Sequence, residues 1–312
     1  MTLKTHVVHS IGSGLRDNKF DQKILNTLIS FIKNLPLGLA FKRFSLKYHN
    51  IEPMTERIKP RFNLDGKVAI ITGASKGIGE SIARGLAENG AKVVISSRKQ
   101  EAVDAVAAAF QADGLTAVGI ACHVGDEEQL KNLVDKTIEQ YGGVDILVNN
   151  AATNPVYGHL VKNDGEIFDK IMNVNVKACM LLANLCFPSM KSRGGGSVIN
   201  IASVEGLKPS EGLGLYSVSK AALIMLTQSQ AKEWGKFNIR ANAICPGLIQ
   251  TKFSAALWQN EAILNTVEKH LPLKRMAQPD EMAGLATFLA SDAASYTTGS
   301  VFTNDGGHMI AG

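Results

Sequence analysis

From Lys67 to the C-terminus, short apolar runs rich in β-branched residues alternate with longer segments of helical periodicity. The apolar runs are 67–72, 91–97, 115–121, 144–149, 197–202, 238–245 and 299–303. The helical patterns lie near 77–89, 99–113, 126–141, 164–192, 214–236 and 278–291. Nearly continuous apolar strands that alternate with helices form parallel sheets buried on both faces. The pattern therefore predicts one α/β domain over residues 61–312, with a doubly wound, seven-stranded parallel sheet.

The chain before this domain has a different composition. Residues 1–53 hold eight basic and three acidic side chains, which accounts for the whole formal net charge of +5. The remaining residues carry no net charge, so a nucleic-acid partner is not predicted. Within residues 24–35 the apolar side chains recur at helical spacing until Pro36, which predicts an amphipathic helix. We therefore interpret residues 1–60 as a basic amphipathic N-terminal extension.

Three interpretations of this extension stay open. Residues 1–53 fit an arm that contacts a membrane surface or a partner, and they also fit an organelle transit segment. The third interpretation is an extension without a role in the fold, with Met54 as the true start. The four cysteines lack the C-x-x-C spacing of a zinc or redox site, so we expect reduced thiols and no metal site. A soluble intracellular protein is expected, in the cytoplasm unless the extension directs it to an organelle.

A glycine-rich segment, residues 72–79 (TGASKGIG), follows the first predicted strand and opens the first helix. Glycines at this place allow a tight turn and a close approach of the backbone to a pyrophosphate. The start of the following helix presents free N–H groups and the positive end of its dipole to the anion. The segment therefore predicts a dinucleotide site, with cofactor contacts from Gly73, Ser75, Lys76, Gly77, Ile78 and Gly79.

The end of the second predicted strand indicates which dinucleotide is preferred. NAD-dependent proteins of this architecture place an acid there, which binds the ribose 2′-hydroxyl. This chain has Ser97 and Arg98 instead, and a guanidinium suits a 2′-phosphate in shape and charge. With Lys76 as a second positive charge, the sequence predicts NADP(H) in preference to NAD(H).

Further motifs follow in order along the chain: Asn149-Asn150-Ala151-Ala152, Asn175, Ser203, Tyr216 with Lys220, Pro246-Gly247 and Asp305-Gly306-Gly307. Together with the glycine segment, this set resembles the short-chain dehydrogenase/reductase family over about residues 65–308. The resemblance implies a Rossmann fold and an oxidoreductase. Within the family, the sequence is similar to NADP-dependent carbonyl reductases, with 3-ketoacyl-thioester reductases as the nearby alternative.

The spacing of the tyrosine and lysine makes chemical sense without the family. Tyr216 and Lys220 are four residues apart, so they share one face of a helix. A free phenol has a pKa near 10, and a neighbouring ammonium favours its deprotonated form. Tyr216 is therefore the candidate general acid and base for proton exchange with a carbonyl oxygen. The resemblance implies that Ser203 binds the substrate oxygen, that Lys220 also binds the nicotinamide ribose, and that Asn175 holds a water of a proton relay.

The resemblance also implies cofactor contacts farther along the chain, and it gives Tyr216 and Lys220 a share in them. The other implied contacts are His123, Val124, Asn149, Ala151, Pro246, Gly247, Ile249 and Thr251. His123 departs from the family, which often has an aspartate against the adenine at this place, so only a backbone contact is expected there.

The apolar segment between Pro246 and about Arg275 predicts a lid over the substrate, with Phe253 and Trp258 as candidate contacts. It has no basic cluster before Lys274, so a neutral ketone, an aldehyde or a ketoacyl thioester suits the site better than a small anion. An NADP-binding regulator without turnover is the alternative of another class. The apolar helices that carry Asn175 and Tyr216 agree with a homodimer or homotetramer, as is common in the family.

Overall fold

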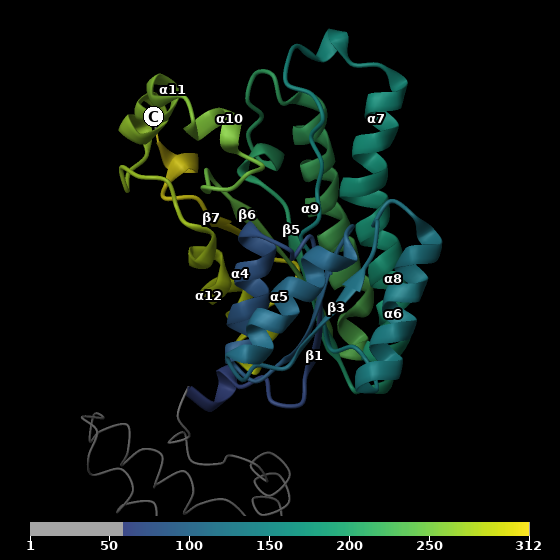
Figure 1. The fold of residues 1–312 in the computed structure, drawn as a ribbon. Helices are drawn as coiled ribbons and strands as arrows, with labels where there is room; N and C mark the ends of the chain where they lie inside the picture. The colour runs from purple at the N-terminus through teal and green to yellow at the C-terminus, as the bar shows by residue number, and fades with distance from the viewer. Residues whose placement is uncertain (1–58, 312) are drawn as a thin grey trace, which may run out of the picture. The chain divides into compact units, whose positions relative to one another are not determined.

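The protein is described by a computed structural model over residues 59–311. Seven strands form one parallel sheet in the order β3-β2-β1-β4-β5-β6-β7. Their bounds are β1 Val68–Thr72, β2 Lys92–Ser97, β3 Ala117–Ala121, β4 Ile146–Asn149, β5 Gly196–Ile201, β6 Ile239–Pro246 and β7 Val301–Asn304. The prediction of a doubly wound, seven-stranded sheet is confirmed (Figure 1).

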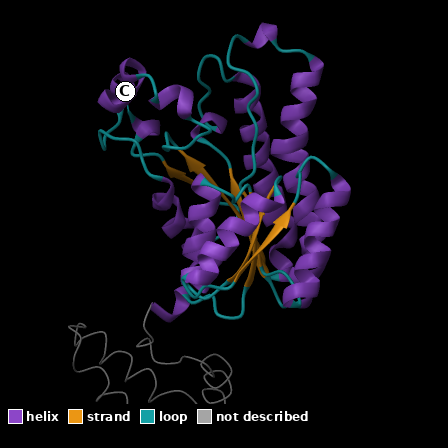
Figure 2. Ribbon diagram, viewed as in Figure 1, coloured by secondary structure: helices purple, strands orange, loops and turns teal. Residues whose placement is uncertain are grey.

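Helices connect the strands and cover the sheet (Figures 1 and 2). Their bounds are α4 Gly77–Glu88, α5 Gln100–Ala112, α6 Glu127–Tyr141, α7 Gly165–Met172, α8 Ala178–Ser192, α9 Gly214–Trp234, α10 Ala255–Trp258, α11 Glu261–His270 and α12 Ala283–Ala290. The single helix predicted over 164–192 is interrupted by a wider π-helical turn, η3 (Asn173–Lys177). The predicted lid contains two short helices, α10 and α11, that the sequence pattern does not indicate.

Two apolar cores lie on opposite faces of the sheet because successive strand residues point to opposite sides. In β1, Ala69 and Ile71 pack with α4, α5 and α12, whereas Ile70 packs with α6, α8 and α9. All five residues of β1 are buried, as expected for a strand covered on both faces.

The strand order reverses direction between β1 and β4. These strands are neighbours in the sheet although 73 residues lie between the end of β1 and the start of β4. In open α/β sheets, ligands bind outside the carboxyl ends of the strands at such a switch point. The glycine segment leaves β1 there, and the Asn149-Asn150 pair ends β4 beside it. The topology therefore places the predicted dinucleotide site at this edge.

A charged pair stabilises the opposite edge of the sheet, where the strands begin. Arg193 ends α8 and donates from Nε and Nη2 to the two carboxylate oxygens of Asp145, at 2.8 and 2.9 Å. Asp145 is 5% exposed and also accepts the backbone N–H of Val68 at 2.8 Å. This pair joins α8 to the entrances of β1 and β4.

The helical stretch Gly165–Ser192 is long and apolar enough to cross a membrane by length and composition. It comprises α7, η3 and α8, and α8 contributes Leu182, Ala183 and Cys186 to the core against the sheet. Packing in that core accounts for part of its apolar composition.

The N-terminal extension lies outside the described residues except for its last two. Its amphipathic helix, its contact with a membrane or a partner, and its boundary at residue 60 therefore stay predictions.

Candidate active site

The glycine segment forms a tight loop that leaves the start of α4 open. Gly73 and Gly77 adopt positive φ angles of 65° and 63°, which favour glycine. A Cβ atom at Gly79 would lie 2.6 Å from the backbone oxygen of Gly73, so only glycine fits this close approach. Lys76 occupies the cap position of α4 without making a side-chain capping bond. The first N–H groups of α4 are thus available to an anion.

Asn150 holds this loop, and the sequence analysis gave this residue no role. Its side-chain amide donates to the backbone oxygens of Thr72 and Gly73 at 2.9 and 3.1 Å. The Thr72 hydroxyl in turn accepts the backbone N–H groups of Asn150 and Ala151, each at 3.1 Å. The turns after β1 and β4 are therefore locked together, with Ala151 against Gly73. The second asparagine of the Asn149-Asn150 pair was the feature of the sequence that could have indicated this role.

Asn149 lies differently from the contact expected of it. Asn149 is 3% exposed, and its side-chain amide donates to Asn200 Oδ1 at 2.8 Å. Asn200 then donates to the Thr227 hydroxyl of α9 at 2.8 Å. The Asn149 side chain thus connects β4, β5 and α9 inside the protein, and its cofactor contact stays a prediction.

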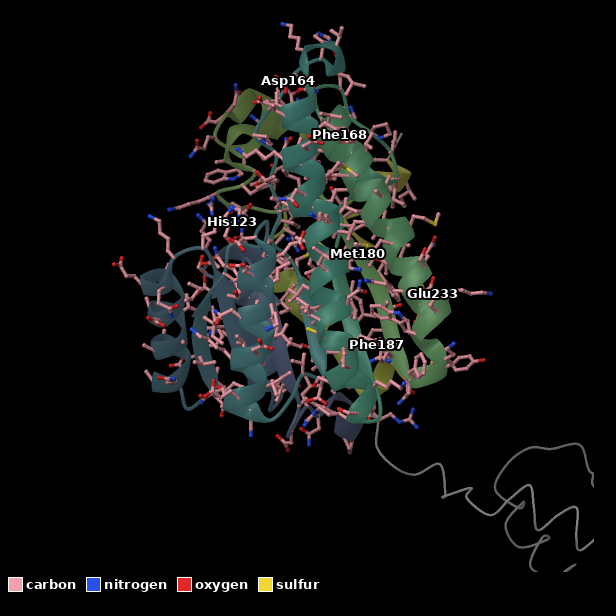
Figure 3. All side chains as sticks on the ribbon, turned by 90° about the vertical axis from the view of Figure 1, so that its right-hand side faces the viewer. His123, Asp164, Phe168, Met180, Phe187 and Glu233 are labelled. Atoms are coloured by element: carbon pink, nitrogen blue, oxygen red, sulfur yellow. The ribbon has the colours of Figure 1, made fainter. Side chains whose placement is uncertain are left out.

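Four predicted cofactor residues lie at or just after the ends of β2 and β3. The backbone oxygen of Ser97, the last residue of β2, accepts the N–H of Cys122, which leads into His123. Arg98 and His123 are exposed, and His123 receives support through its backbone N–H, which donates to Gln129 Oε1 at 2.8 Å (Figure 3). Val124 is half-buried against the core on the α6 side. Within residues 59–311, neither Arg98 nor Lys76 forms an ion pair, so both charges are free for an anion.

The segment after β6 forms the wall opposite the glycine loop. Gly247 follows Pro246 and donates its N–H to Asn304 of β7 at 3.1 Å, and Ile249 pairs with Ala277. Thr251 faces the loop, because a Cβ atom at Gly77 would lie 3.4 Å from its methyl group. The structure thus brings together glycine-loop and post-β6 residues that are 174 positions apart.

Ser254 is a second residue that the sequence analysis missed. Its hydroxyl donates to the backbone oxygen of Ile249 and lies 3.2 Å from Thr251 Oγ1. The Trp258 indole N–H donates to the backbone oxygen of Thr251 at 2.9 Å. Trp258 therefore anchors this wall, whereas Phe253 is 57% exposed and places its ring centroid 6.0 Å from that of Tyr216.

Tyr216, Lys220 and Ser203 meet where β5 ends against α9. The Lys220 ammonium donates to the backbone oxygen of Ile201 at 2.7 Å and lies 5.6 Å from the centroid of the Tyr216 ring. Ser203 follows β5, caps the short helix η4 (Val204–Gly206), and lies near enough to the Tyr216 phenol to lower its pKa. The structure therefore brings together these three predicted catalytic residues.

The electrostatics of this group keep the phenol protonated. Burial raises the pKa of Tyr216 well above its usual value; the hydrogen bond with Ser203 lowers it in part, and Glu205 and Cys245 raise it further. Burial lowers the pKa of Lys220 to about 8. At neutral pH the site therefore holds a protonated phenol beside the Lys220 ammonium. The expected lowering of the Tyr216 pKa by the lysine is not seen, because burial of the phenol outweighs it.

Asn175 lies in the π-helical turn η3 and is fully buried. Its amide donates to Thr153 O and to Ser219 Oγ, each at 3.0 Å, and its oxygen accepts the Thr153 N–H at 2.8 Å. The side chain thus joins η3 to α9 and to the loop after β4. These protein groups already occupy its amide, and the predicted water contact stays a prediction.

A family model described as "Enoyl-(Acyl carrier protein) reductase" matches residues 73–309. Dehydrogenase/reductase SDR family member 4 of Oryctolagus cuniculus is 48% identical over 244 residues, which cover 78% of this chain and 94% of that protein. Tropinone reductase-like 3 of Erythroxylum coca is 42% identical and covers 78% of this chain and 93% of its own length. The chain belongs to the short-chain dehydrogenase/reductase family. The resemblance stated from the sequence motifs is thereby confirmed, and the family is one of oxidoreductases.

Solved structures of this family share the fold. A gluconate 5-dehydrogenase of Burkholderia cenocepacia, in complex with NADP and tartrate, has a TM-score of 0.78 and 34% identity and covers 81% of this chain and 98% of its own. A 7α-hydroxysteroid dehydrogenase complexed with NADH and 7-oxo glycochenodeoxycholic acid has a TM-score of 0.77 and 35% identity. The match covers 80% of this chain and 96% of that protein. These short-chain dehydrogenases differ in both substrate and nicotinamide cofactor.

Proposed function

We propose that this short-chain dehydrogenase/reductase is an NADP(H)-dependent enzyme that interconverts a ketone or aldehyde and its alcohol. The observation that carries the proposal is the meeting of Tyr216, Lys220 and Ser203 beside an uncapped helix start at the switch point of the sheet. A regulator without turnover would not need a buried lysine held next to a buried phenol.

The residues at the glycine loop fit a dinucleotide phosphate. Gly79 leaves no room for a side chain, and the start of α4 is open to an anion. The preference for NADP(H) is supported by Arg98 and Lys76, two exposed cations without an ion pair in the described domain. A relative with NADP and another with NADH show that the family uses both cofactors, so the local charge decides the preference.

When bound, NADPH supplies the hydride for the carbonyl carbon. The chain's own residues supply the proton and stabilise the developing charge on the carbonyl oxygen. Ser203 orients that oxygen by a hydrogen bond, Tyr216 donates its proton to it, and Lys220 stabilises the phenolate that remains. In the opposite direction the Tyr216 phenolate takes the proton of the alcohol.

The substrate is proposed to be neutral, and a 3-ketoacyl thioester is the second candidate. That alternative is favoured by the matched family model, whose description names the acyl carrier protein. An intracellular enzyme is proposed, in the cytoplasm unless residues 1–53 direct it to an organelle, and its four buried, unpaired cysteines agree with a reducing compartment.

Oxidation of NADPH and of NADH, followed at 340 nm with the full chain, tests the proposal. The panel contains aromatic ketones, aliphatic aldehydes, quinones and ketoacyl thioesters. We expect turnover of at least one neutral carbonyl, with a higher kcat/KM for NADPH than for NADH. Tight NADPH binding without turnover of any compound would instead favour the regulator.

We further propose that two copies of the chain pack through α8 and α9. Exposed apolar side chains gather on these helices and on the adjoining α7; Figure 3 shows Phe168 of α7 and Met180 of α8. Val218 and Met225 of α9 are 49% and 61% exposed. Light scattering is expected to give a dimer or tetramer, and Met225→Glu is expected to weaken it. A monomer at micromolar concentration would contradict the proposal.

A further inference from the structure

Glu205 is the centre of a hydrogen-bond cluster next to the proposed catalytic group. It lies in η4, two residues after Ser203, and its backbone N–H donates to Ser203 Oγ at 3.2 Å. Its carboxylate accepts three bonds: from the Ser210 N–H at 2.8 Å, from the Ser210 hydroxyl at 2.7 Å and from the Ser217 hydroxyl at 3.1 Å. The Glu205 side chain thus links the segment after the proposed catalytic serine to the loop 207–213 and to the first turn of α9.

The loop 207–213 is held at its far end as well. Gly158, from the loop after β4, donates its N–H to the Gly212 oxygen at 3.0 Å, and the Tyr157 ring lies against Gly212. With Glu205 at the near end, this loop is fixed on both sides of Ser210. It leads directly into α9, which carries Tyr216 and Lys220.

The donors to Glu205 are neutral, so they stabilise its negative charge without cancelling it. Within residues 59–311 Glu205 forms no ion pair. The titratable groups that face Tyr216 are Glu205 from η4, Cys245 from β6 and Lys220 from its own helix, with Ser203 as a hydrogen-bond partner. Glu205 is the carboxylate of this set, and its field raises the pKa of Tyr216.

We propose that Glu205 is a positioning and specificity residue: it fixes the loop 207–213 against α9, and its charge disfavours anionic groups on a substrate near Tyr216. The inference rests on the proposed carbonyl reduction and names its substrate class as neutral. A carboxylate bonded to the turn of α9 that carries Tyr216 repels a second carboxylate, whereas an amide of the same shape is accepted.

The test compares Glu205→Gln with Glu211→Gln in the full chain. Glu211 lies on the same loop, and its side chain is 85% exposed and lies 3.8 Å from His159. Both variants remove one negative charge, but only Glu205 contacts Ser210 and Ser217. Glu205→Asp keeps the charge and shortens the reach. If Glu205→Gln does not fold, Glu205→Asp tests the positioning by the exchange at Ser210, and the wild-type preference for the neutral over the anionic ketone tests the charge.

Three readouts are measured. The first is the ratio of kcat/KM for 4-acetylbenzamide and 4-acetylbenzoate, a neutral and an anionic ketone of equal shape. Glu205→Gln is expected to reduce the wild-type preference for the amide by about five-fold or more. The second is the pH profile of alcohol oxidation, whose apparent pKa is expected to fall by about 0.5 to 1 unit in Glu205→Gln. Glu211→Gln is expected to leave both unchanged.

The third readout needs no turnover: it is the hydrogen exchange of the Ser210 amide, which is expected to accelerate at least about ten-fold in Glu205→Gln. Unchanged selectivity together with an unchanged pH profile would overturn the role of the charge. Unchanged exchange at Ser210 would overturn the positioning role. A wild-type protein that reduces no carbonyl would contradict the proposed function itself, and the exchange readout would still judge the positioning.

Discussion

Lys220 donates a hydrogen bond of 2.7 Å to the backbone oxygen of Ile201, the last residue of β5. This bond links the catalytic helix α9 to the strand end that leads into Ser203. It holds a positive charge at a buried place, where the lysine is 2% exposed. The position of the ammonium relative to Tyr216 is therefore set by the sheet as well as by the helix.

The buried lysine makes stability depend on pH in a defined window. Folding lowers the pKa of Lys220 from 10.5 to about 8 because burial disfavours the charged form. Between these values the unfolded chain binds the extra proton, so the free energy of unfolding rises with pH. Relative to Lys220→Met, the wild type is expected to gain about 1–2 kcal/mol between pH 7.5 and 9.5. Urea unfolding at several pH values measures this difference, and a difference that stays constant would contradict the assignment.

Gly79→Ala is expected to weaken dinucleotide binding strongly. The new methyl group would collide with the Gly73 backbone and with the Asn150 amide that holds the loop. The matched control is Gly284→Ala in α12, where a Cβ atom meets nothing within 4 Å. Isothermal titration with NADPH is expected to show at least a ten-fold loss for Gly79→Ala and none for Gly284→Ala. Equal affinity in the two variants would show that the loop does not approach the phosphates.

Arg98→Ala is expected to weaken NADPH binding by about ten-fold or more and to leave NADH binding nearly unchanged. A charge-assisted bond to the 2′-phosphate contributes only with NADPH, at roughly 1.5–3 kcal/mol. Lys136→Ala, an exposed charge change on α6, serves as the control. Fluorescence titration with both cofactors gives the ratio. A ratio equal to that of the wild type would refute the preference for NADP(H).

Arg193→Ala is expected to destabilise the fold by about 3 kcal/mol, because it leaves the buried Asp145 carboxylate without its cation. Lys131→Ala removes an exposed pair with Asp135 and is expected to change stability by less than about 0.5 kcal/mol. Chemical unfolding of both variants measures the contrast. Similar effects would mean that the pair at the amino-terminal edge contributes no more than a surface pair.

The order of strands and helices was predictable because each strand of the sheet is a short apolar run with turn residues at its ends. Details that depend on distant contacts were not. In the run 144–149 the strand begins only at Ile146, and the two residues before it contact the end of α8: the Asp145 carboxylate binds Arg193, and Val144 donates its N–H to the Ser189 hydroxyl. No local sequence pattern indicates these partners, because each lies more than 40 residues from the residue that it contacts.

The candidate catalytic residues could be selected from local spacing and order, but the residues that hold them in place could not. Asn150 supports the glycine loop only because β1 and β4 are neighbours in the sheet. The π-helical turn at Asn175 is stabilised by Thr153 and Ser219, each from another segment. The role of Glu205 in holding the loop 207–213 could not be predicted from the sequence, because its bonds to Ser210 and Ser217 require the loop to fold back.

The most direct test of the proposed chemistry is single-turnover oxidation of NADPH by stopped flow, in the wild type and in Tyr216→Phe. Tyr296→Phe, which changes a fully exposed tyrosine, is the control. With the best carbonyl of the panel, the rate in Tyr216→Phe is expected to fall at least about 100-fold while NADPH affinity is kept, because proton donation contributes ~10²–10⁴ in rate. A rate within a few-fold of the wild type would contradict the assignment of Tyr216 as the proton donor.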